Sequence, residues 1–222
     1  DFEINFDEID NKKISLEEKE FRNKNLKLFN SLGFPNKRLE NWKFTDLKEI
    51  IYRNFDQLNT KVGAANINKI NLLKDFDHNY IFLVNGNLHT SNFDHEKKDK
   101  IKINSYENDV NYPTSTNSLV CLNHALAENG YSLEIEKNYK FKKALIIYNF
   151  FTKEVKNKIL NIKNKIKINE NSEIHFVEYT INESKFINNV YEHIVLEKNS
   201  KLKSLYIQSN KNEGYFYKFL QN

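Results

Sequence analysis

A short pattern recurs three times in the second half of the chain, and it constrains the fold more than any other feature. Residues 166–180 read IKINENSEIHFVEYT and residues 194–208 read IVLEKNSKLKSLYIQ, so that Asn171 and Asn199 stand 28 positions apart at equivalent places. A third copy, LEIEKNYKFKKALIIY at 133–148, places Asn138 33 positions before Asn171. Apolar residues alternate on both sides of each asparagine, which is typical of two strands joined at a corner. One copy is too small to bury both its strands, so the copies are expected to stack.

The repeats predict a mixed α and β protein in which an N-terminal helical region is followed by a right-handed parallel β-helix. The asparagine at each corner would adopt a left-handed backbone conformation, which Asn tolerates better than most residues. A meandering antiparallel sandwich is the alternative, but it favours turns rich in Gly and Pro, and the chain has five Gly and two Pro. Residues 1–130 are assigned to the N-terminal helical and mixed region, and residues 131–222 to the start of the β-helix domain. The last residues, GYFYKFLQN, begin another apolar strand without a cap, and the chain contains no Met. We therefore expect that the sequence is trimmed and that the β-helix is truncated at its C-terminus.

Local signals upstream of the repeats predict three helices and one hairpin. Ser15 and Glu18 form a capping box, and a helix should run from there to Gly33. Phe21, Leu28 and Leu32 are expected on one packed side of it, with Leu26 and Phe29 beside them. Thr45 is expected to cap a second helix, and residues 118–130 to form a third with Leu119, Leu122 and Leu126 inward. Residues 80–89 read as two strands around the turn Asn85-Gly86.

Composition limits the classes of function. The chain has 34 Lys plus Arg against 30 Asp plus Glu, a near balance that indicates a soluble surface rather than a dedicated binder of polyanions. It has one cysteine, no secretory signal and no long apolar run, which favours a reducing cytoplasmic compartment without a membrane span. Its five glycines form neither a phosphate-binding loop nor a dinucleotide-binding motif.

Four groups of residues have the types needed for chemistry, and each is interpreted as structural. His95-Glu96-Lys97-Lys98-Asp99 approaches a zinc-protease motif but lies in a charged segment, so a solvated turn is expected. Cys121 and His124 could form an activated thiolate, yet the flanking leucines indicate a buried, inert cysteine. Glu178 could share a metal with His175 or His193, but His175 and Glu178 fall on opposite faces of a strand, and surface positions are expected.

The fourth group is a stripe of lysines, Lys156, Lys158, Lys163, Lys165 and Lys167, with no acid between them. Such a stripe could bind phosphates. The interpretation that we favour is the outer face of a strand whose Ile166 and Ile168 point inward, because no aromatic residue lies within the stripe to stack on bases. Nucleic acid is therefore not expected as a partner. The sequence predicts no catalytic, cofactor-binding or metal-binding residue.

The segment FNSLGFPNKRLENWKFTDL at 29–47 carries a resemblance to a known family. A helix that ends in F-x-x-L-G-x-P, followed by E-x-W-K-[YF]-T and a leucine, resembles the N-terminal region of the SufD family, part of the SufBCD scaffold for iron–sulfur cluster assembly. The matching residues are Phe29, Leu32, Gly33, Pro35, Glu40, Trp42, Lys43, Phe44, Thr45 and Leu47. Further similar positions are Phe82, Val84, Asn85, Gly86, Leu122, Asn123, Ala125 and Gly130, with Cys121 in place of an alanine, and Glu178 with Tyr179. The similarity to the related SufB family is weaker.

The resemblance implies a scaffold subunit without enzymatic activity that pairs with SufB and is driven by the SufC ATPase. It also implies that the family's histidine for cluster assembly lies beyond residue 222, so no residue here takes that role. This part alone would bind no cofactor, and the iron–sulfur cluster would be assembled with the partner subunit, since a lone cysteine cannot hold a cluster. Two alternatives remain open at this point: a β-helix protein that binds or processes polysaccharide, and a nucleic-acid binder that uses the lysine stripe.

Overall fold

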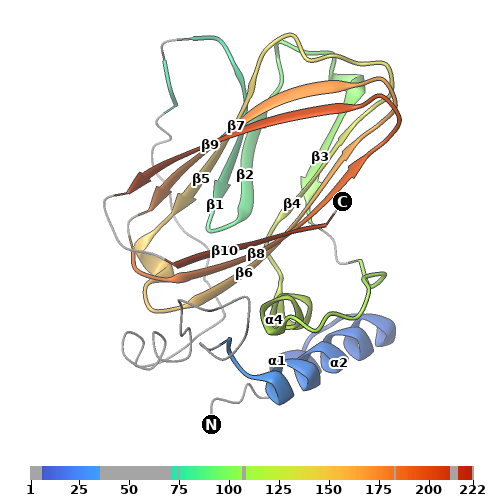
Figure 1. Ribbon diagram of the computed structural model, residues 1–222. Coiled ribbons are helices and arrows are strands. Elements are labelled where there is room, and N and C mark those ends of the chain that lie inside the picture. Colours follow the sequence, from blue (N-terminus) through green and yellow to red (C-terminus); the bar gives the residue numbers. More distant parts are fainter. Residues whose placement is uncertain are drawn as a thin grey trace.

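The computed structural model describes residues 7–35, 72–74, 76–106, 109–182, 184–210 and 215–221, and this part of the chain is mostly β. Figure 1 shows two facing sheets, with the helices along the outer side of the lower one. The helices are α1 (Asp7–Asp10), α2 (Leu16–Leu32) and α4 (Ser118–Leu126), with short 3₁₀ turns at Lys98–Lys100 and Lys153–Val155. The strands are β1 (Asn79–Val84), β2 (Asn87–Asn92), β3 (Ile101–Ser105), β4 (Tyr131–Ile135), β5 (Leu145–Phe151), β6 (Ile159–Ile168), β7 (Glu173–Asn182), β8 (Ile187–Leu196), β9 (Lys201–Asn210) and β10 (Tyr215–Gln221). None of the helices in these described ranges is long and apolar enough to cross a membrane.

The strands form two five-stranded sheets of mixed direction. The first sheet has the order β2-β1-β5-β7-β9 and the second the order β10-β8-β6-β4-β3. From β4 onward, consecutive strands alternate between the sheets, and the strands that meet within a sheet are parallel. The pairs β1–β2 and β3–β4 are antiparallel.

The prediction of a helical region followed by a right-handed parallel β-helix is therefore wrong. The strands collect into two mixed sheets, and the helical part of the N-terminal region is small. The physical reason lies in the earliest strands: the Asn85-Gly86 turn folds β2 back beside β1, and β3 pairs in the opposite direction with β4. Only β1–β2 is a hairpin closed by a short turn, whereas β3 and β4 pair across the segment that contains α4. Both antiparallel pairs lie at sheet edges, ahead of the repeats.

The stacking of the repeats is confirmed. Ile166 of β6 pairs with Ile194 of β8, and Ile174 of β7 pairs with Leu202 of β9. The register of both pairs therefore equals the sequence spacing between Asn171 and Asn199.

The left-handed corners predicted from the sequence are also confirmed. The three corner asparagines have φ values of 60° (Asn138), 57° (Asn171) and 57° (Asn199). Their side chains form a ladder in which Asn199 Nδ2 donates to Asn171 Oδ1 at 3.2 Å and Asn171 Nδ2 donates to Asn138 Oδ1 at 3.0 Å. The ladder fixes the repeats to one another at the corner.

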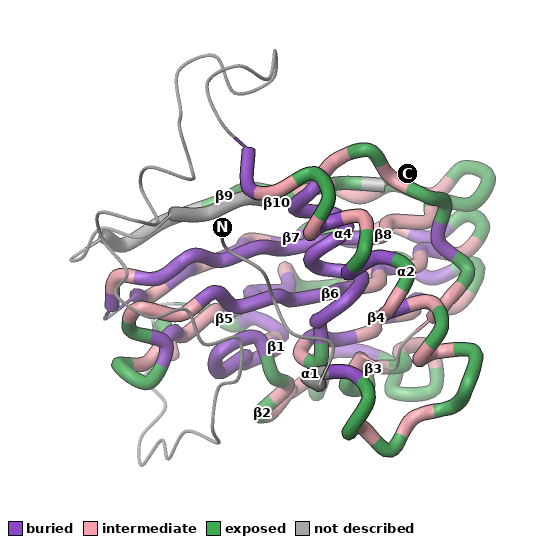
Figure 2. The backbone as a smooth tube through the Cα atoms, turned by 90° about the horizontal axis from the view of Figure 1, so that it is seen from below, coloured by how far each residue is buried: buried purple, intermediate pink, exposed green. Residues whose placement is uncertain are grey.

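The core has two main parts, one on each side of the second sheet. Between the sheets, apolar side chains from both inner faces meet, among them Ile147, Ile166, Ile174 and Phe176. On the outer side, α2 and α4 pack on the second sheet through Leu26, Phe29, Leu119, Leu122, Ile159 and Ile187. Figure 2 shows buried residues along β6 and β7 and exposed ones at the turns. Each fully buried Leu, Ile or Phe contributes about 1.5–3 kcal/mol, so both parts stabilise the fold.

The local predictions for the helices and the hairpin are mostly confirmed. Ser15 Oγ accepts from Glu18 N at 3.1 Å at the start of α2, and Gly33 ends the helix at φ 69°. The Phe34 ring then packs edge-on against the Phe29 ring, with 5.0 Å between the two ring centroids. Of the predicted apolar residues, Leu26 and Phe29 are buried, together with Arg22 and Asn25. Leu32 is 49% exposed, so its prediction as part of the packed side is wrong. The hairpin forms as predicted, and the third helix forms but ends at Leu126, before the predicted end at Gly130. Trp42 and the helix predicted from Thr45 lie outside the described residues.

Candidate functional site

A cavity of about 410 Å³ lies between the two sheets, toward the end at which β9 and β10 form the sheet edges. Its walls are mainly apolar and come from both sheets, with Phe151, Phe176, Ile162 and Val190 among them. Polar side chains also line it: Asn149, Asn164, Glu178, Thr180, Asn188, Glu192, Ser204, Tyr206 and Lys218. An apolar hollow with a few convergent polar groups is the usual form of a small-molecule site.

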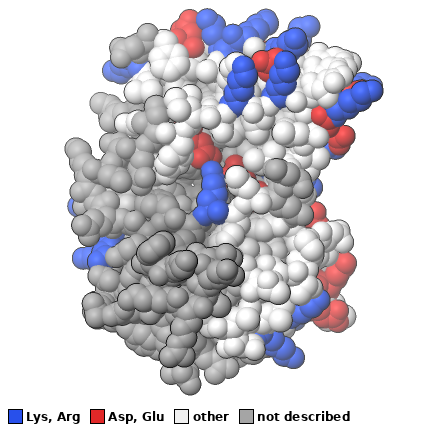
Figure 3. All heavy atoms as spheres, in the orientation of Figure 1, with Lys and Arg blue, Asp and Glu red and all other residues white. Residues whose placement is uncertain are grey.

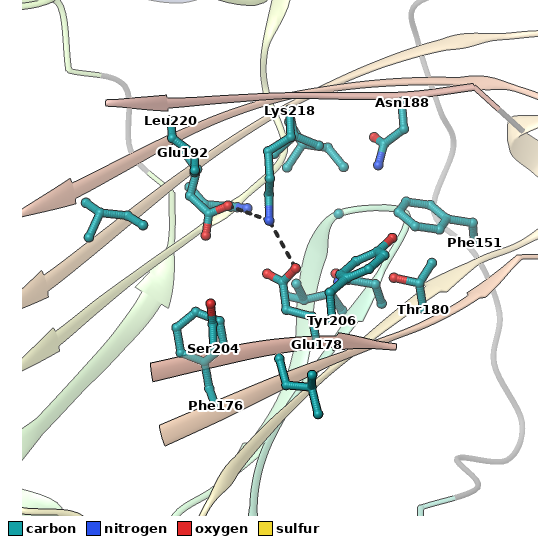
Figure 4. A pocket seen from close by; sticks show the side chains of 18 of the residues that line it. Phe151, Phe176, Glu178, Thr180, Asn188, Glu192, Ser204, Tyr206, Lys218 and Leu220 are labelled. Carbon is teal, nitrogen blue, oxygen red and sulfur yellow. Dashed lines mark hydrogen bonds and ion pairs between the residues drawn. The ribbon is translucent and has the colours of Figure 1, made fainter. Parts of the chain in front are cut away.

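Two buried carboxylates face each other across this cavity with a lysine between them (Figure 4). Glu178 comes from β7 in the first sheet and Glu192 from β8 in the second, with exposed fractions of 7% and 1%. Lys218 of β10 places its Nζ 3.0 Å from Glu178 Oε2 and 2.8 Å from Glu192 Oε2. The ammonium thus links three strands and both sheets.

The electrostatics of this group follow from its burial. Burial alone would lower the pKa of Lys218, but the charges of Glu192 and Glu178 outweigh it and raise that pKa well above the ordinary value. Burial raises the pKa of Glu192, against the opposing effect of Lys218 and with the help of Glu178. Two carboxylates share one ammonium, so the cavity favours the uptake of a proton or of another positive charge.

The structure separates the residues that the sequence offered as a metal site. Glu178 points inward, whereas His175 is exposed and lies 2.9 Å from the carboxylate of Glu173. His193 and the inward-facing Glu192 are neighbours in β8, so the imidazole of His193 is directed to the opposite face. The prediction of opposite faces is confirmed, but the expected surface position of Glu178 is wrong. No group of three or more His, Cys, Asp or Glu that could hold a metal occurs within the described residues.

A second polar group lies on the outer face of the second sheet, under the helices. Lys163 of β6 is 1% exposed, and its Nζ lies 2.8 Å from Nδ1 of the buried His124. The same Nζ lies 4.5 Å from the ring centroid of Tyr112, 5.6 Å from that of Phe21 and 5.8 Å from that of Tyr191. The amine is therefore enclosed by three aromatic rings and an imidazole, away from water.

Burial dominates the protonation of this second group. It lowers the pKa of Lys163 to about 7, with a further contribution from the Arg22 guanidinium. Burial and the nearby Lys163 lower the pKa of His124 to about 3. Arg22 is itself buried and donates to the carbonyl oxygens of Ala125 and Ala127 at 2.9 and 2.8 Å. The imidazole is thus neutral at physiological pH, and the amine is close to its titration midpoint.

The lysine stripe is not a continuous surface feature. Lys163 is buried, while Lys165 and Lys167 lie 3.8 Å from Asp109 and 3.7 Å from Glu134. Ile166 and Ile168 point inward as predicted. In Figure 3, Lys and Arg gather along the upper edge with acidic side chains among them. The stripe is therefore interrupted by burial and by ion pairs.

Cys121 and Glu96 are both structural. The Cys121 side chain is fully buried, its Sγ donates to the Ser115 carbonyl at 3.3 Å, and burial raises the pKa of the thiol, so the predicted burial of the cysteine is confirmed. The expected solvated turn at Glu96 is wrong. Its carboxylate is 8% exposed and accepts hydrogen bonds from Asn79 and the Tyr139 hydroxyl, and from the backbone N–H groups of Lys142 and Lys143.

Sequence reasoning missed Glu192 and Lys218. Both line the cavity from strands of the second sheet, and Glu192 lies one repeat length after Asn164, its partner in the neighbouring strand. The available signal was the position of Glu192 in the segment NVYEHIV, where it alternates with Val190 and Ile194 and so falls on the buried face of the strand. A charged residue on a buried face requires a buried partner.

One comparison with known proteins is informative. A family model described as the SufBD protein N-terminal region matches residues 2–113, half of the 222 residues. The match includes the helix end at Gly33 and the Trp42 segment that carry the resemblance noted in the sequence. No curated protein matches the chain.

Proposed function

The chain belongs to the SufBD protein family of the Suf iron–sulfur cluster assembly system, and we propose that it serves there as a SufD-type scaffold subunit. In this role it has no enzymatic activity of its own, acts in the cytoplasm, pairs with a SufB homologue and is driven by a SufC-type ATPase. The observation that carries the proposal is the family match over residues 2–113, together with the SufD-like pattern from Phe29 to Leu47. The nascent cluster is the cargo of the complex.

The state of the only cysteine supports a subunit that shares its cargo with a partner. Cys121 is buried in the apolar cluster that α2 and α4 form with the second sheet, and its raised pKa keeps the thiol protonated. Iron–sulfur clusters are held mainly by thiolates, which must be deprotonated and accessible. In the proposed complex, the SufB partner therefore supplies the thiolates.

Exposed apolar residues at the sheet edges also support a role within a complex. Leu205 and Tyr206 of β9 are 60% and 51% exposed, and Leu220 of β10 is 63% exposed. Apolar residues gathered at the edge strands of two sheets are suited to burial against another protein surface. This edge is the described surface that best fits an interface between subunits.

The test is co-expression of the full chain with SufB and SufC homologues from the same genome, followed by affinity capture and size-exclusion chromatography with mass determination. The proposal predicts one stable complex that contains all three proteins. A parallel co-expression replaces SufB with a SufD homologue. Complex formation with SufD in place of SufB would overturn the SufD-type role in favour of a SufB-type role, and elution of the chain alone in both cases would overturn the scaffold role.

A further inference from the structure

We propose that the cavity between the two sheets binds a small organic molecule that carries an alkylammonium group on an apolar body. This inference rests on the walls and charges of the cavity and concerns the chain by itself, since Tyr206 and Leu220 at the open side also belong to the edge that we propose as the subunit interface. The scaffold proposal assigns no role to Glu178, Glu192 or Lys218.

The dimensions and walls of the cavity fit a compact organic ligand. Its volume of about 410 Å³ falls at the lower end of the range of roughly 300–1,000 Å³ that is usual for small-molecule sites. The walls are mostly apolar, with Leu83, Phe151, Phe176 and Ile194 among them. Such walls would surround the hydrocarbon part of a ligand and remove it from water.

The pair of carboxylates can hold a second cation in addition to Lys218. Lys218 Nζ donates a hydrogen bond to Glu178 Oε2, and it lies 2.8 Å from Glu192 Oε2. Within the described residues, however, the buried Glu192 Oε2 has no hydrogen-bond donor in suitable geometry, so it can accept from another donor. With both carboxylates ionised, one ammonium neutralises half of their charge. The Lys218 side chain itself demonstrates the type of group that this pair of carboxylates holds: an ammonium on an alkyl stem.

A second observation points to a missing hydrogen-bond donor elsewhere in the same cavity. Asn188 lines the cavity, is 5% exposed, and its Oδ1 has no hydrogen-bond partner within the described residues. A buried carbonyl oxygen without a donor costs about 1–3 kcal/mol, so such atoms are normally satisfied by a ligand or by water. An ammonium has three N–H groups and could donate to both carboxylates at once.

The composition of the cavity favours an organic cation over a metal ion. A metal site would gather its ligands closely around one point, whereas here the two carboxylates are already joined through Lys218, and the remaining lining is largely aliphatic and aromatic. The side chains of Tyr206 and Leu220 line the cavity and are half exposed or more, so they mark its open side. The Tyr206 ring could contact the cation face-on as it enters.

The experiment titrates the full chain with primary ammonium compounds from butylammonium to 2-phenylethylammonium and follows amide chemical shifts by NMR. The matched neutral probe is 2-phenylethanol, and the matched anion is 3-phenylpropionate. We expect saturable shifts at the cavity strands with the ammonium compounds, and binding of the alcohol and the anion that is weaker by about tenfold or more. Glu178→Gln keeps the shape of the side chain and should weaken ammonium binding by about ten- to hundredfold. The control Glu197→Gln, at an exposed corner, should leave it unchanged.

Several results would overturn the proposal. These are no saturable shift with any ammonium probe, equal affinity for 2-phenylethylammonium and 2-phenylethanol, or unchanged affinity in Glu178→Gln. If Glu178→Gln fails to fold, the affinities of the natural chain for 2-phenylethylammonium, 2-phenylethanol and 3-phenylpropionate decide alone. Tighter binding of Nα-acetyl-lysine N-methylamide, whose ε-amine is free, than of any of the simple ammonium probes would show that the site takes a lysine side chain of a protein, and the small-molecule proposal would then be wrong.

Discussion

Replacing Lys163 with methionine should remove a pH dependence from the stability of the whole protein. In the folded chain, the amine is enclosed by Tyr112, Phe21, Tyr191 and His124, and burial lowers the pKa from 10.5 to about 7. The unfolded chain therefore holds a proton on this amine throughout the range from pH 7 to pH 10.5, whereas the folded chain has lost it. Stability must rise with pH wherever the unfolded state binds more protons.

The size of the effect follows from the shift. The full change in the pKa of Lys163 corresponds to about 5 kcal/mol of unfolding free energy across the whole window. Between about pH 7 and about pH 9.5, the unfolding free energy should rise by about 3 kcal/mol of this total. Tyr112 and Tyr131 have raised pKa values and would lower stability above pH 10, so measurements should stop below that value.

The assay is urea unfolding of the natural chain and of Lys163→Met at several pH values in this range. Methionine has a similar length and no charge, so the difference between the two curves isolates the amine; the unpaired Nδ1 of His124 adds a cost that does not change with pH. We expect the natural chain to gain about 3 kcal/mol relative to the variant over the range. Two curves that stay parallel would refute the buried neutral amine.

Three further predictions concern positions fixed by the backbone or the core. Asn171→Ala should lower the unfolding free energy by about 1–2 kcal/mol more than Asn171→Gly, because alanine is strained at φ 57°; chemical denaturation measures this, and equal losses would contradict it. Gly130→Ala should cost about 3 kcal/mol or more, since the added Cβ would lie 1.8 Å from the carbonyl oxygen of Lys163, and an unchanged melting temperature would be inconsistent with that contact. Cys121 should react with iodoacetamide far more slowly in the folded chain than in urea, and equal rates, followed by mass spectrometry, would show an accessible thiol.

The sequence predicted the repeats well because their signals are local. The spacing of Asn171 and Asn199 became the register of two parallel strand pairs, and the corner asparagines adopted the expected left-handed conformation. The capping box at Ser15 and the Asn85-Gly86 turn likewise depend on a few neighbouring residues. Such features are specified by backbone sterics and short-range hydrogen bonds, so a single sequence contains them.

The features that were missed depend on distant parts of the chain. The antiparallel pairing of β3 with β4 joins segments that are separated in the sequence by the whole of α4, and it helped to convert the expected single coil into two mixed sheets. Lys163, Lys165 and Lys167 lie on the same face of β6, yet only Lys163 is buried beneath α2 and α4. The alternation of residues in a strand does not show where a helix packs on the sheet. Glu178 was expected on the surface, although it lies on the same face of the strand as the inward-facing Ile174 and Phe176. Its partner Lys218 comes from β10, far along the chain, so the sequence near Glu178 does not show it.

The equality between sequence spacing and strand register also bears on how such a chain can change during evolution. An in-frame duplication or loss of the unit from Asn171 to Lys198 would bring equivalent residues to the same sheet positions and return an asparagine to the corner ladder. The insertion or deletion of a single residue within β7 would instead shift the strand by one position, so that a neighbour from the outer face would take the inward place of Glu178. Length variation among homologous genes should therefore occur in whole units or at the corners, and seldom within the strands.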